Sequence, residues 1–484
     1  MNRRRPNILL LLGDQHRADC LGCYGNRDIR TPALDRLASD GTVYEESYCA
    51  SPLCTPSRYS LLTGMYPHQH MGWSNRSTIP PAFDTFATIL KKEGYRTAAV
   101  GKMHLTPTYQ DIGFDEMLLA EQNGEGRFED DYHRELKERG LIDRVDLTDQ
   151  VQEYRKQADD EYWANFGAFV SDLPEEHHST SWIGRHALDE LEKWSADRPN
   201  LLMVSFIKPH HPFDPPRPWD RMYDPEKLTL LPGWTEECLP DDLRMHPGFF
   251  PHERLTAKKL REIMAYYYAT ISHIDHWIGR MIELLKSRGL YDDTLIVYTS
   301  DHGEYLGFHH LLLKQNYMYD PLVKVPLIIK WPDRPGGIRS DRLISNVDLA
   351  VTLIRQGGGE PAPYMAGMDI GNPESIRTHV FCEELRGRQY MVRTREHKLI
   401  WCAEESLSRL FDLSRDPLEM NDLFGDPSYA AECERLQRAL SDMVLFRCPA
   451  PVHLDESARV LDKGRSHAAE REAVKQWIRS QMSG

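Results

Sequence analysis

Ser-Pro-Leu-Cys-Thr-Pro-Ser-Arg-Tyr-Ser-Leu-Leu-Thr-Gly, residues 51–64, is the stretch around which the rest of the chain is organised. Thr55 is a good N-cap, a proline follows at the first helical position, and Gly64 is placed to end the helix. Cys54 is therefore expected just before a helix N-terminus, where free N–H groups and the helix dipole favour negative charge. Arg58 adds a cation one turn later. A buried thiol with a surface arginine is the competing interpretation of the stretch alone.

Four apolar stretches predict buried strands of an open α/β sheet, at residues 7–13, 97–100, 201–207 and 295–299. Ligands of such sheets bind at the carboxyl ends of the strands. One strand that ends in reactive side chains could arise by chance, but four point to a shared site. The residues that follow these strands and carry chemistry are Asp14, Gln15, Lys102, His104, His210, Asp301 and His302.

The chain is long enough for one large domain and a smaller one. We predict an α/β protein with a large mixed, mostly parallel sheet sandwiched by helices, in residues 1–358. A C-terminal α+β subdomain with a small hairpin-rich sheet is expected over residues 359–450. Residues 451–484 form a charged tail, either an oligomer arm or a surface helix. The segment 121–180 is expected to be mainly a solvated insertion, part of which walls the cleft.

The overall charge excludes some classes of function. Lys and Arg number 59 against 74 Asp and Glu, which gives a net charge of −15 and argues against nucleic acid or an anionic membrane as partner. The N-terminal apolar run is too short for a signal peptide, and no stretch approaches the roughly 20 apolar residues of a membrane span. Nine cysteines without framework spacing predict reduced thiols and a cytoplasmic protein.

The residues at the strand ends suggest a metal site. Carboxylate and amide oxygens from Asp14, Gln15 and Asp301 suit a hard cation such as Ca²⁺ or Mg²⁺, whereas the imidazole of His302 leans towards Mn²⁺. The alternative is that both aspartates cap helices. Lysines and histidines further along the chain could each be structural or solvated when they are considered one at a time.

Several motifs together resemble the type I sulfatases. Residues 54–58 resemble the signature Cys-x-Pro-x-Arg, and residues 61–64 resemble its Leu-x-Thr-Gly tail. Gly-Lys-Met-His at 101–104 and Pro-His-His-Pro-Phe at 209–213 are similar to further sulfatase segments. Residues 416–423 resemble a segment of the C-terminal domain of that family, with an aspartate where asparagine is usual. The resemblance extends from residue 6 to about residue 423 and implies an alkaline phosphatase-like fold.

The resemblance also implies a chemistry. A formylglycine-generating enzyme would oxidise Cys54 to formylglycine, whose hydrate attacks the sulfur of a sulfate ester. A histidine, by analogy His210, would protonate the departing alkoxide, and His104 would accept a proton when the adduct collapses. The resemblance assigns the metal, Ca²⁺ with Mn²⁺ or Mg²⁺ as alternatives, to Asp14, Gln15, Cys54, Asp301 and His302. The implied catalytic set is Cys54, Arg58, Lys102, His104, His210 and Lys314, with Asn75 as a substrate contact.

Two alternatives stay open at this point. Asp14-Gln15 and Asp301-His302 are also the forms found in phosphonate monoester hydrolases, whereas Gly-Lys-x-His at 101–104 is what those enzymes typically lack and favours a sulfatase. A metal-binding interaction protein without catalysis is the second alternative. The expected substrate is a small anionic ester, either a sulfated sugar or an aryl or alkyl sulfate. A homo-oligomer is compatible with the charged tail.

Overall fold

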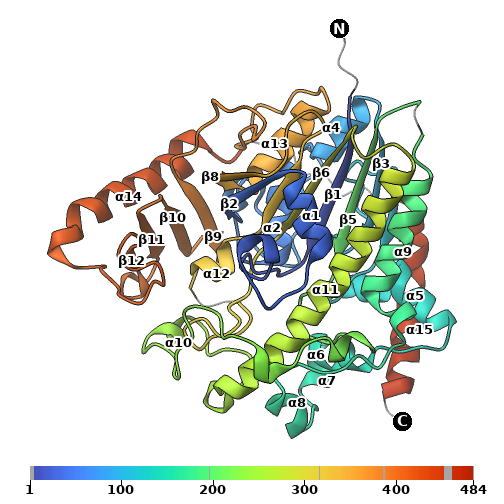
Figure 1. Cartoon of the computed structure of the whole chain (residues 1–484), viewed down its shortest axis with the longest axis horizontal. Helices are drawn as coiled ribbons and strands as arrows, with labels where there is room; N and C mark the ends of the chain where they lie inside the picture. Colours follow the sequence, from blue (N-terminus) through green and yellow to red (C-terminus); the bar gives the residue numbers. More distant parts are fainter. Residues whose placement is uncertain (1–4, 196, 315–316, 385–386, 452–459, 483–484) are drawn as a thin grey trace.

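The computed structural model describes residues 5–195, 197–314, 317–384, 387–451 and 460–482. An eight-stranded mixed sheet forms the centre, in the order β4-β3-β5-β1-β6-β7-β2-β8 (Figure 1). All its neighbouring strands are parallel except for β7, which runs antiparallel to both β6 and β2. The strands are β1 (Asn7–Gly13), β2 (Thr42–Tyr48), β3 (Arg96–Gly101), β4 (Glu116–Leu119), β5 (Asn200–Phe206), β6 (Thr294–Ser300), β7 (Leu327–Lys330) and β8 (Ile338–Ser345).

Helices cover both faces of this sheet because successive side chains of a strand point to opposite faces. Leu9 and Leu11 of β1 pack with one group of helices, α1 (Pro32–Ser39), α9 (Ser179–Glu192) and α11 (Ala257–Ser287). Ile8 and Leu10 belong to the cluster on the other face. The helices of that second face are α2 (Cys54–Thr63), α4 (Phe86–Lys92) and α13 (Val347–Gln356). Every residue of β1 is buried, as the continuous apolar run predicts.

The strand order explains how the site is assembled. The four predicted strands are β1, β3, β5 and β6, and they are consecutive neighbours in the order β3-β5-β1-β6. All four are parallel, so their carboxyl ends lie at the same edge of the sheet. The polar segments that follow them are therefore adjacent in space. The predicted fold class, a mostly parallel mixed α/β sheet between helices, is confirmed.

A second sheet has the order β12-β11-β10-β9 and is antiparallel throughout. One of its faces packs on α14 (Ala430–Asp442) through Leu436 and Leu440. The other face packs on the segment after β6, including Tyr305 and Tyr319. The small sheet therefore supports the part of the large domain that borders the site. Its strands are β9 (Val380–Glu384), β10 (Gln389–Arg393), β11 (His397–Cys402) and β12 (Arg409–Asp412).

Four strands of the large sheet lie outside the strand predictions: β2, β4, β7 and β8. β8 has the clearest reason, because its first half, Ile-Arg-Ser-Asp-Arg, is polar and largely exposed, as an edge strand can be. β4 is also an edge strand and has only four residues. Such strands are specified by their partner in the sheet rather than by their own apolar pattern.

The segment 121–180 differs from the expectation of a mainly solvated insertion. It folds into short helices, α5 (Asp131–Glu138), α6 (Arg144–Gln150), α7 (Gln152–Arg155) and α8 (Asp160–Ala164), and buries several of its acidic residues. The charges are buried because they pair within the protein, as Asp146 does with Arg127. Helix α15 (Asp462–Met482) packs on this segment through Val474 and Ile478, so this part of the tail is a packed helix. Among the described residues, no helix has the length and apolar character needed to cross a bilayer.

Candidate active site

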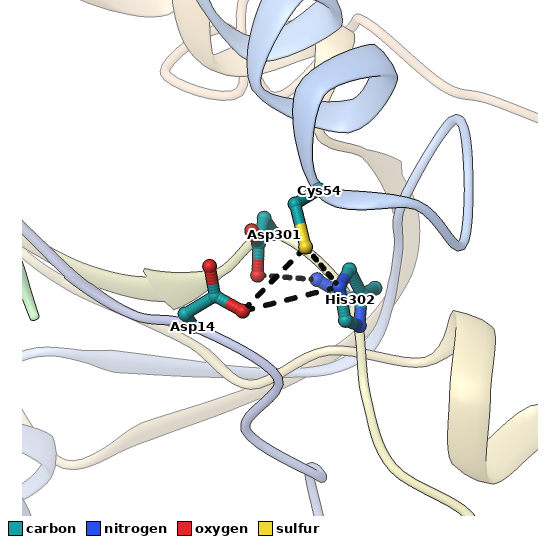
Figure 2. Close-up of side chains that lie close together, drawn as sticks. All are labelled: Asp14, Cys54, Asp301 and His302. Atoms are coloured by element: carbon teal, nitrogen blue, oxygen red, sulfur yellow. Dashed lines mark hydrogen bonds and ion pairs between the residues drawn. The ribbon is translucent and has the colours of Figure 1, made fainter. Parts of the chain in front are cut away.

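Helix α2 begins at Cys54, two residues earlier than predicted. Thr55 is not its cap; the Thr55 hydroxyl donates instead to the carbonyl oxygen of His104, at 3.1 Å. The Oδ1 atom of Asn75 accepts from the backbone N–H of Thr55 at 3.1 Å, so a side chain distant in sequence takes over that acceptor role. Cys54 therefore lies in the first turn of a buried helix, with its sulfur at the site (Figure 2).

Figure 2 shows Asp14, Cys54, Asp301 and His302 converging on one point. One ligand atom from each lies within 4.8 Å of all the others, and all four residues are buried. The ring of His302 has its Nδ1 2.9 Å from the carbonyl oxygen of Gly303, and its Nε2 is directed towards the cluster, 3.2 Å from the Cys54 sulfur. Carboxylate oxygens with one imidazole fit a divalent cation of the Ca²⁺, Mg²⁺ or Mn²⁺ class.

Gln15 adjoins this cluster through an unusual backbone. Its φ of 62° lies in the left-handed region, which non-glycine residues adopt mainly at strained or functional sites. Its backbone N–H donates to Oδ1 of Asp301 at 3.1 Å. Its side-chain Oε1 accepts from Lys314 at 3.0 Å, and its Nε2 donates to Glu304. Gln15 is thus fixed beside the carboxylates with its amide oxygen on the side of Lys314.

Arg58 is a buried structural cation of the site, and the interpretation as a surface arginine is wrong. Only 1% of its surface is exposed. It forms ion pairs of 2.9 Å with both Asp14 and Asp301. Its Nη1 donates to the carbonyl oxygen of Lys102 at 2.6 Å and to the hydroxyl of Ser205 at 2.8 Å. Arg58 therefore joins the ends of four neighbouring strands.

Two lysines make the site strongly cationic. Lys102 Nζ lies 2.8 Å from Asp14, and Lys314 Nζ lies 3.1 Å from the Cys54 sulfur. Burial alone would raise the pKa of the Cys54 thiol, but Lys314, Lys102 and His302 overcome burial and hold that pKa well below its usual range. Burial also acts to raise the pKa of Asp14, yet nearby cations keep it below its usual range. A negative charge at the position of the Cys54 side chain is thus strongly stabilised.

His210 is placed for proton transfer beside Lys314. Its Nδ1 lies 2.7 Å from the carbonyl oxygen of His211, an acceptor, so this nitrogen carries the hydrogen. Its Nε2 is 3.1 Å from Lys314 Nζ. Burial, together with Lys314 and Lys102, holds the pKa of His210 well below its usual range. His210 is therefore a neutral imidazole whose Nε2 accepts a hydrogen bond from Lys314.

His104 also lies beside Cys54 and has a left-handed backbone, with φ of 57°. Its backbone N–H donates to Glu121 at 2.8 Å, and a hydrogen bond from its ring contributes to the lowered pKa of Cys54. The buried Nδ1 atom has no hydrogen-bond partner among the described residues. His104 and Asn75 both line a cavity of about 520 Å³. All predicted site residues are thus brought to one edge of the sheet.

Several residues that hold the site gave no signal in the sequence. Gln122 donates to the carbonyl oxygen of His211 at 2.8 Å and accepts from Lys102 at 3.4 Å. Asp149 lies 2.6 Å from the ring of His211, which stacks on His210 at 4.4 Å between ring centres. These contacts come from the insertion, whose polar sequence resembles that of any exposed segment. The residues missed are Glu121, Gln122 and Asp149 of the insertion, together with Ser205, Glu304 and Glu384 from other parts of the chain.

Glu384 belongs to the same surroundings from the side of the small sheet. It ends β9, is 7% exposed, and its Oε2 has no hydrogen-bond partner among the described residues. Burial raises the pKa of Glu384 to about 7, against the opposing influence of His302 and Lys314. The small sheet therefore contributes a carboxyl group to the electrostatics of the site.

The chain matches two protein-family models and several known sulfatases. A family model described as Sulfatase matches residues 6–359, and a model described as N-sulphoglucosamine sulphohydrolase, C-terminal, matches residues 307–445. An arylsulfatase of Clostridium perfringens is 28% identical over 90% of this chain and 94% of its own length. An N-acetylglucosamine-6-O-sulfatase of Bacteroides thetaiotaomicron is 27% identical over 95% and 90% of the two chains.

Among solved structures, the phosphonate monoester hydrolase of Agrobacterium radiobacter superposes with a TM-score of 0.75 at 25% identity. This similarity covers 91% of this chain and 95% of that one. The fold is therefore that of the alkaline phosphatase-like superfamily, as the motifs predicted. With a family model covering most of the chain and a strand-end site that carries its signature residues, the protein belongs to the sulfatase family of enzymes.

Proposed function

We propose that this enzyme hydrolyses sulfate esters through a formylglycine made from Cys54. The observation that carries the proposal is the environment of the Cys54 side chain. Its sulfur stands where the hydrate oxygens of formylglycine would be, 3.1 Å from Lys314 and 3.2 Å from His302. A buried position this favourable to negative charge suits both an anionic nucleophile and the sulfuryl group that it attacks.

Asp14, Gln15, Asp301 and His302 would hold one divalent metal ion, with Cys54 after its conversion as a further ligand. The fit rests on the four buried donor groups whose ligand atoms lie within 4.8 Å of one another. When bound, the ion would increase the acidity of the nucleophile and neutralise charge on the ester. We propose Ca²⁺ as the ion, with Mn²⁺ and Mg²⁺ as the alternatives.

The remaining residues have roles that follow from their positions. Arg58 holds Asp14 and Asp301 in place, and Lys102 and Lys314 would stabilise the sulfuryl oxygens. His210 would protonate the leaving oxygen. Because His210 is neutral in the structure, the proton would come from Lys314, which lies 3.1 Å from its Nε2.

His104 would accept the proton that is released when the adduct collapses. Its ring is buried beside Cys54, with its Nδ1 unpartnered among the described residues. Asn75 would contact the substrate through its Nδ2 group, because its Oδ1 accepts from the backbone N–H of Thr55. These roles place the leaving alcohol between His210 and the cavity that His104 lines.

The substrate class follows from the relatives. Two are named as an arylsulfatase and an N-acetylglucosamine-6-O-sulfatase, so sulfated sugars and aryl sulfates are the classes to test first. The enzyme would depend on a formylglycine-generating enzyme and act in the cytoplasm, since its nine cysteines are all free.

Cys54 itself provides the decisive experiment. Conversion to formylglycine removes a sulfur and two hydrogens from the tryptic peptide that contains residue 54, adds an oxygen, and makes the peptide reactive towards hydrazides. Cys54→Ser should abolish turnover or trap a sulfate ester, because serine has no second hydroxyl to expel sulfate. Full multiple-turnover activity in a sample whose Cys54 is entirely free thiol would refute the proposal.

A phosphonate monoester or phosphodiester hydrolase with the same nucleophile is the second candidate. Gln15 and His302 favour it, as does the structural similarity to a phosphonate monoester hydrolase. The two candidates separate when a phenyl sulfate and a phenyl phosphonate monoester are compared at equal concentration. A higher kcat/KM for the sulfate supports the first proposal, and the reverse order supports the second.

A further inference from the structure

The cavity beside His104 contains an unusual distribution of charge. It has a volume of about 520 Å³ and lies between the turn that follows residue 73, the segment after β3 and helix α15. His104 places it next to the proposed reaction centre. The ionisable residues that line it are Arg76, His104, Glu121, Glu125, Glu129 and Arg471.

Arg76 is carried by a turn that is anchored to the nucleophile helix at both ends. On one side, Oδ1 of Asn75 accepts from the backbone N–H of Thr55 at 3.1 Å. On the other, the hydroxyl of Tyr59 donates to the carbonyl oxygen of Ser77 at 2.6 Å. Both anchors lie within the first two turns of α2. The backbone of Arg76 is therefore held at a fixed position relative to Cys54.

Three other charged residues of the cavity, Arg471, Glu125 and Glu129, already have counter-charges. Arg471 forms ion pairs with Glu129 and, at 3.2 Å, with Glu125, which also pairs with Lys475 at 2.9 Å. Glu121 accepts from the backbone N–H of His104, and burial raises its pKa. The cavity walls thus offer acceptors for hydroxyl groups, and Arg471 is already paired with acids of the chain.

Arg76 is the exception. Its guanidinium forms no ion pair and no side-chain hydrogen bond with any part of the chain that the structure describes. The side chain of Arg76 is exposed and extends from an anchored backbone. An arginine without a counter-ion favours binding of a carboxylate or a sulfate, and it can hold either with two parallel hydrogen bonds. No group of the proposed catalytic mechanism requires a cation at this position.

We propose that Arg76 is a specificity-determining residue that binds a second anionic group on the alcohol part of the substrate. The preferred substrates would then be sulfate esters of alcohols that also carry a carboxylate or a second sulfate. This assignment rests on the proposed function, because it takes the cavity beside His104 as the site of the leaving alcohol.

Matched aryl esters test the proposal. Phenyl sulfates with –CH₂COO⁻ or the neutral –CH₂CONH₂ at the meta or para position differ in charge but have similar leaving groups. The formylglycine-containing wild type should prefer the acid over the amide by about tenfold in kcat/KM for at least one position. Arg76→Gln should remove this preference and leave the amide rate unchanged, whereas Arg76→Lys should retain part of it.

Arg27→Gln is the matched control, since Arg27 is also exposed and lines none of the cavities near the site. It should keep the full preference. An equal loss on acid and amide in Arg76→Gln, or a wild type without preference at either position, would overturn the assignment of Arg76. Failure of the formylglycine-containing wild type to hydrolyse any of these esters would instead overturn the proposed function.

Discussion

Two clusters of buried charge differ in whether they are balanced. The junction cluster lies where the small sheet meets the large domain and consists of Glu46, Asp320, Lys324, Arg393, Lys398 and Glu419. Its three cations and three acids pair at distances of 2.7 to 3.2 Å. Lys398 and Glu419 are almost completely buried. Each charge of this cluster has an opposite charge within the protein.

The site cluster consists of Asp14, Arg58, Lys102, Asp301 and Lys314. Arg58 and Lys102 pair with the two aspartates, but Lys314 contacts no carboxylate among the described residues. Its contacts are an amide, the Cys54 sulfur and two histidines. The Cys54 thiol, whose pKa Lys314 helps to hold well below its usual range, supplies the anion beside that lysine. Conversion of Cys54 to formylglycine would remove this anion and leave a buried cation in excess, which is costly unless another anion completes the cluster. The balanced cluster thus holds two sheets together, whereas the site cluster would require an anion from outside the chain once Cys54 is converted.

The largest effect expected is on metal binding. Asp301→Ala should lose the divalent ion and all measurable turnover, because it removes a carboxylate from the centre of the donor cluster. Metal analysis after chelator treatment and reconstitution compares the amount of metal bound by Asp301→Ala with the amount bound by the wild type. Glu419→Gln, in the junction cluster, should bind metal as the wild type does. Unchanged stoichiometry in Asp301→Ala would exclude it as a ligand.

The next effect concerns proton transfer beside Lys314. His210→Ala should lower kcat by about 10² to 10⁴ on alkyl sulfates, whose leaving groups need a proton, and much less on activated aryl sulfates. The measurement is a plot of kcat against the pKa of the leaving alcohol for both proteins. Parallel lines for the two proteins would show that His210 contributes to binding rather than to protonation.

In the junction cluster the effect should fall on stability. Lys398→Met leaves Asp320 and Glu419 without their shared cation and should lower the free energy of unfolding by about 3 to 5 kcal/mol, with kcat unchanged. Urea unfolding measures this change in the free energy of unfolding. Arg395→Met, which breaks an exposed ion pair of 2.9 Å with Asp341, is the control and should cost less than about 1 kcal/mol. Equal costs would contradict the structural role of the buried cluster.

The smallest effect concerns a buried histidine without a counter-charge. Burial, with His68 nearby, lowers the pKa of His70 to about 3. The folded protein keeps His70 neutral, whereas the unfolded chain binds a proton below about pH 6.5. Stability is therefore lost as the pH falls from 6.5 towards 3, by about 2 kcal/mol between pH 7 and pH 5. Comparing urea unfolding of wild type and His70→Gln at pH 7 and pH 5 measures the contribution of His70 to this loss of stability. An identical pH dependence of stability in the two proteins would refute the contribution of His70.

The sequence by itself determined the elements that bury continuous apolar runs. The prediction of β1 agrees with the structure at both ends, since that strand has a strong apolar pattern and clear boundary residues. The C-terminal end of α2 was also predictable, because Gly64 adopts a left-handed φ of 65°. Most of the site residues could be found because they follow a strand in a polar motif, and Cys54 and Arg58 because they lie in the stretch 51–64.

Only the tertiary structure decided how those residues are supported. The insertion places Gln122 and Asp149 around His211 from a segment without strong periodicity, and the small sheet brings Glu384 near Lys314. Asn75 replaces Thr55 as the acceptor at the start of α2. A polar side chain has the same local sequence pattern whether it faces solvent or a buried partner. Which of the two it meets depends on contacts between residues far apart in the chain, and these are fixed only when the layers pack.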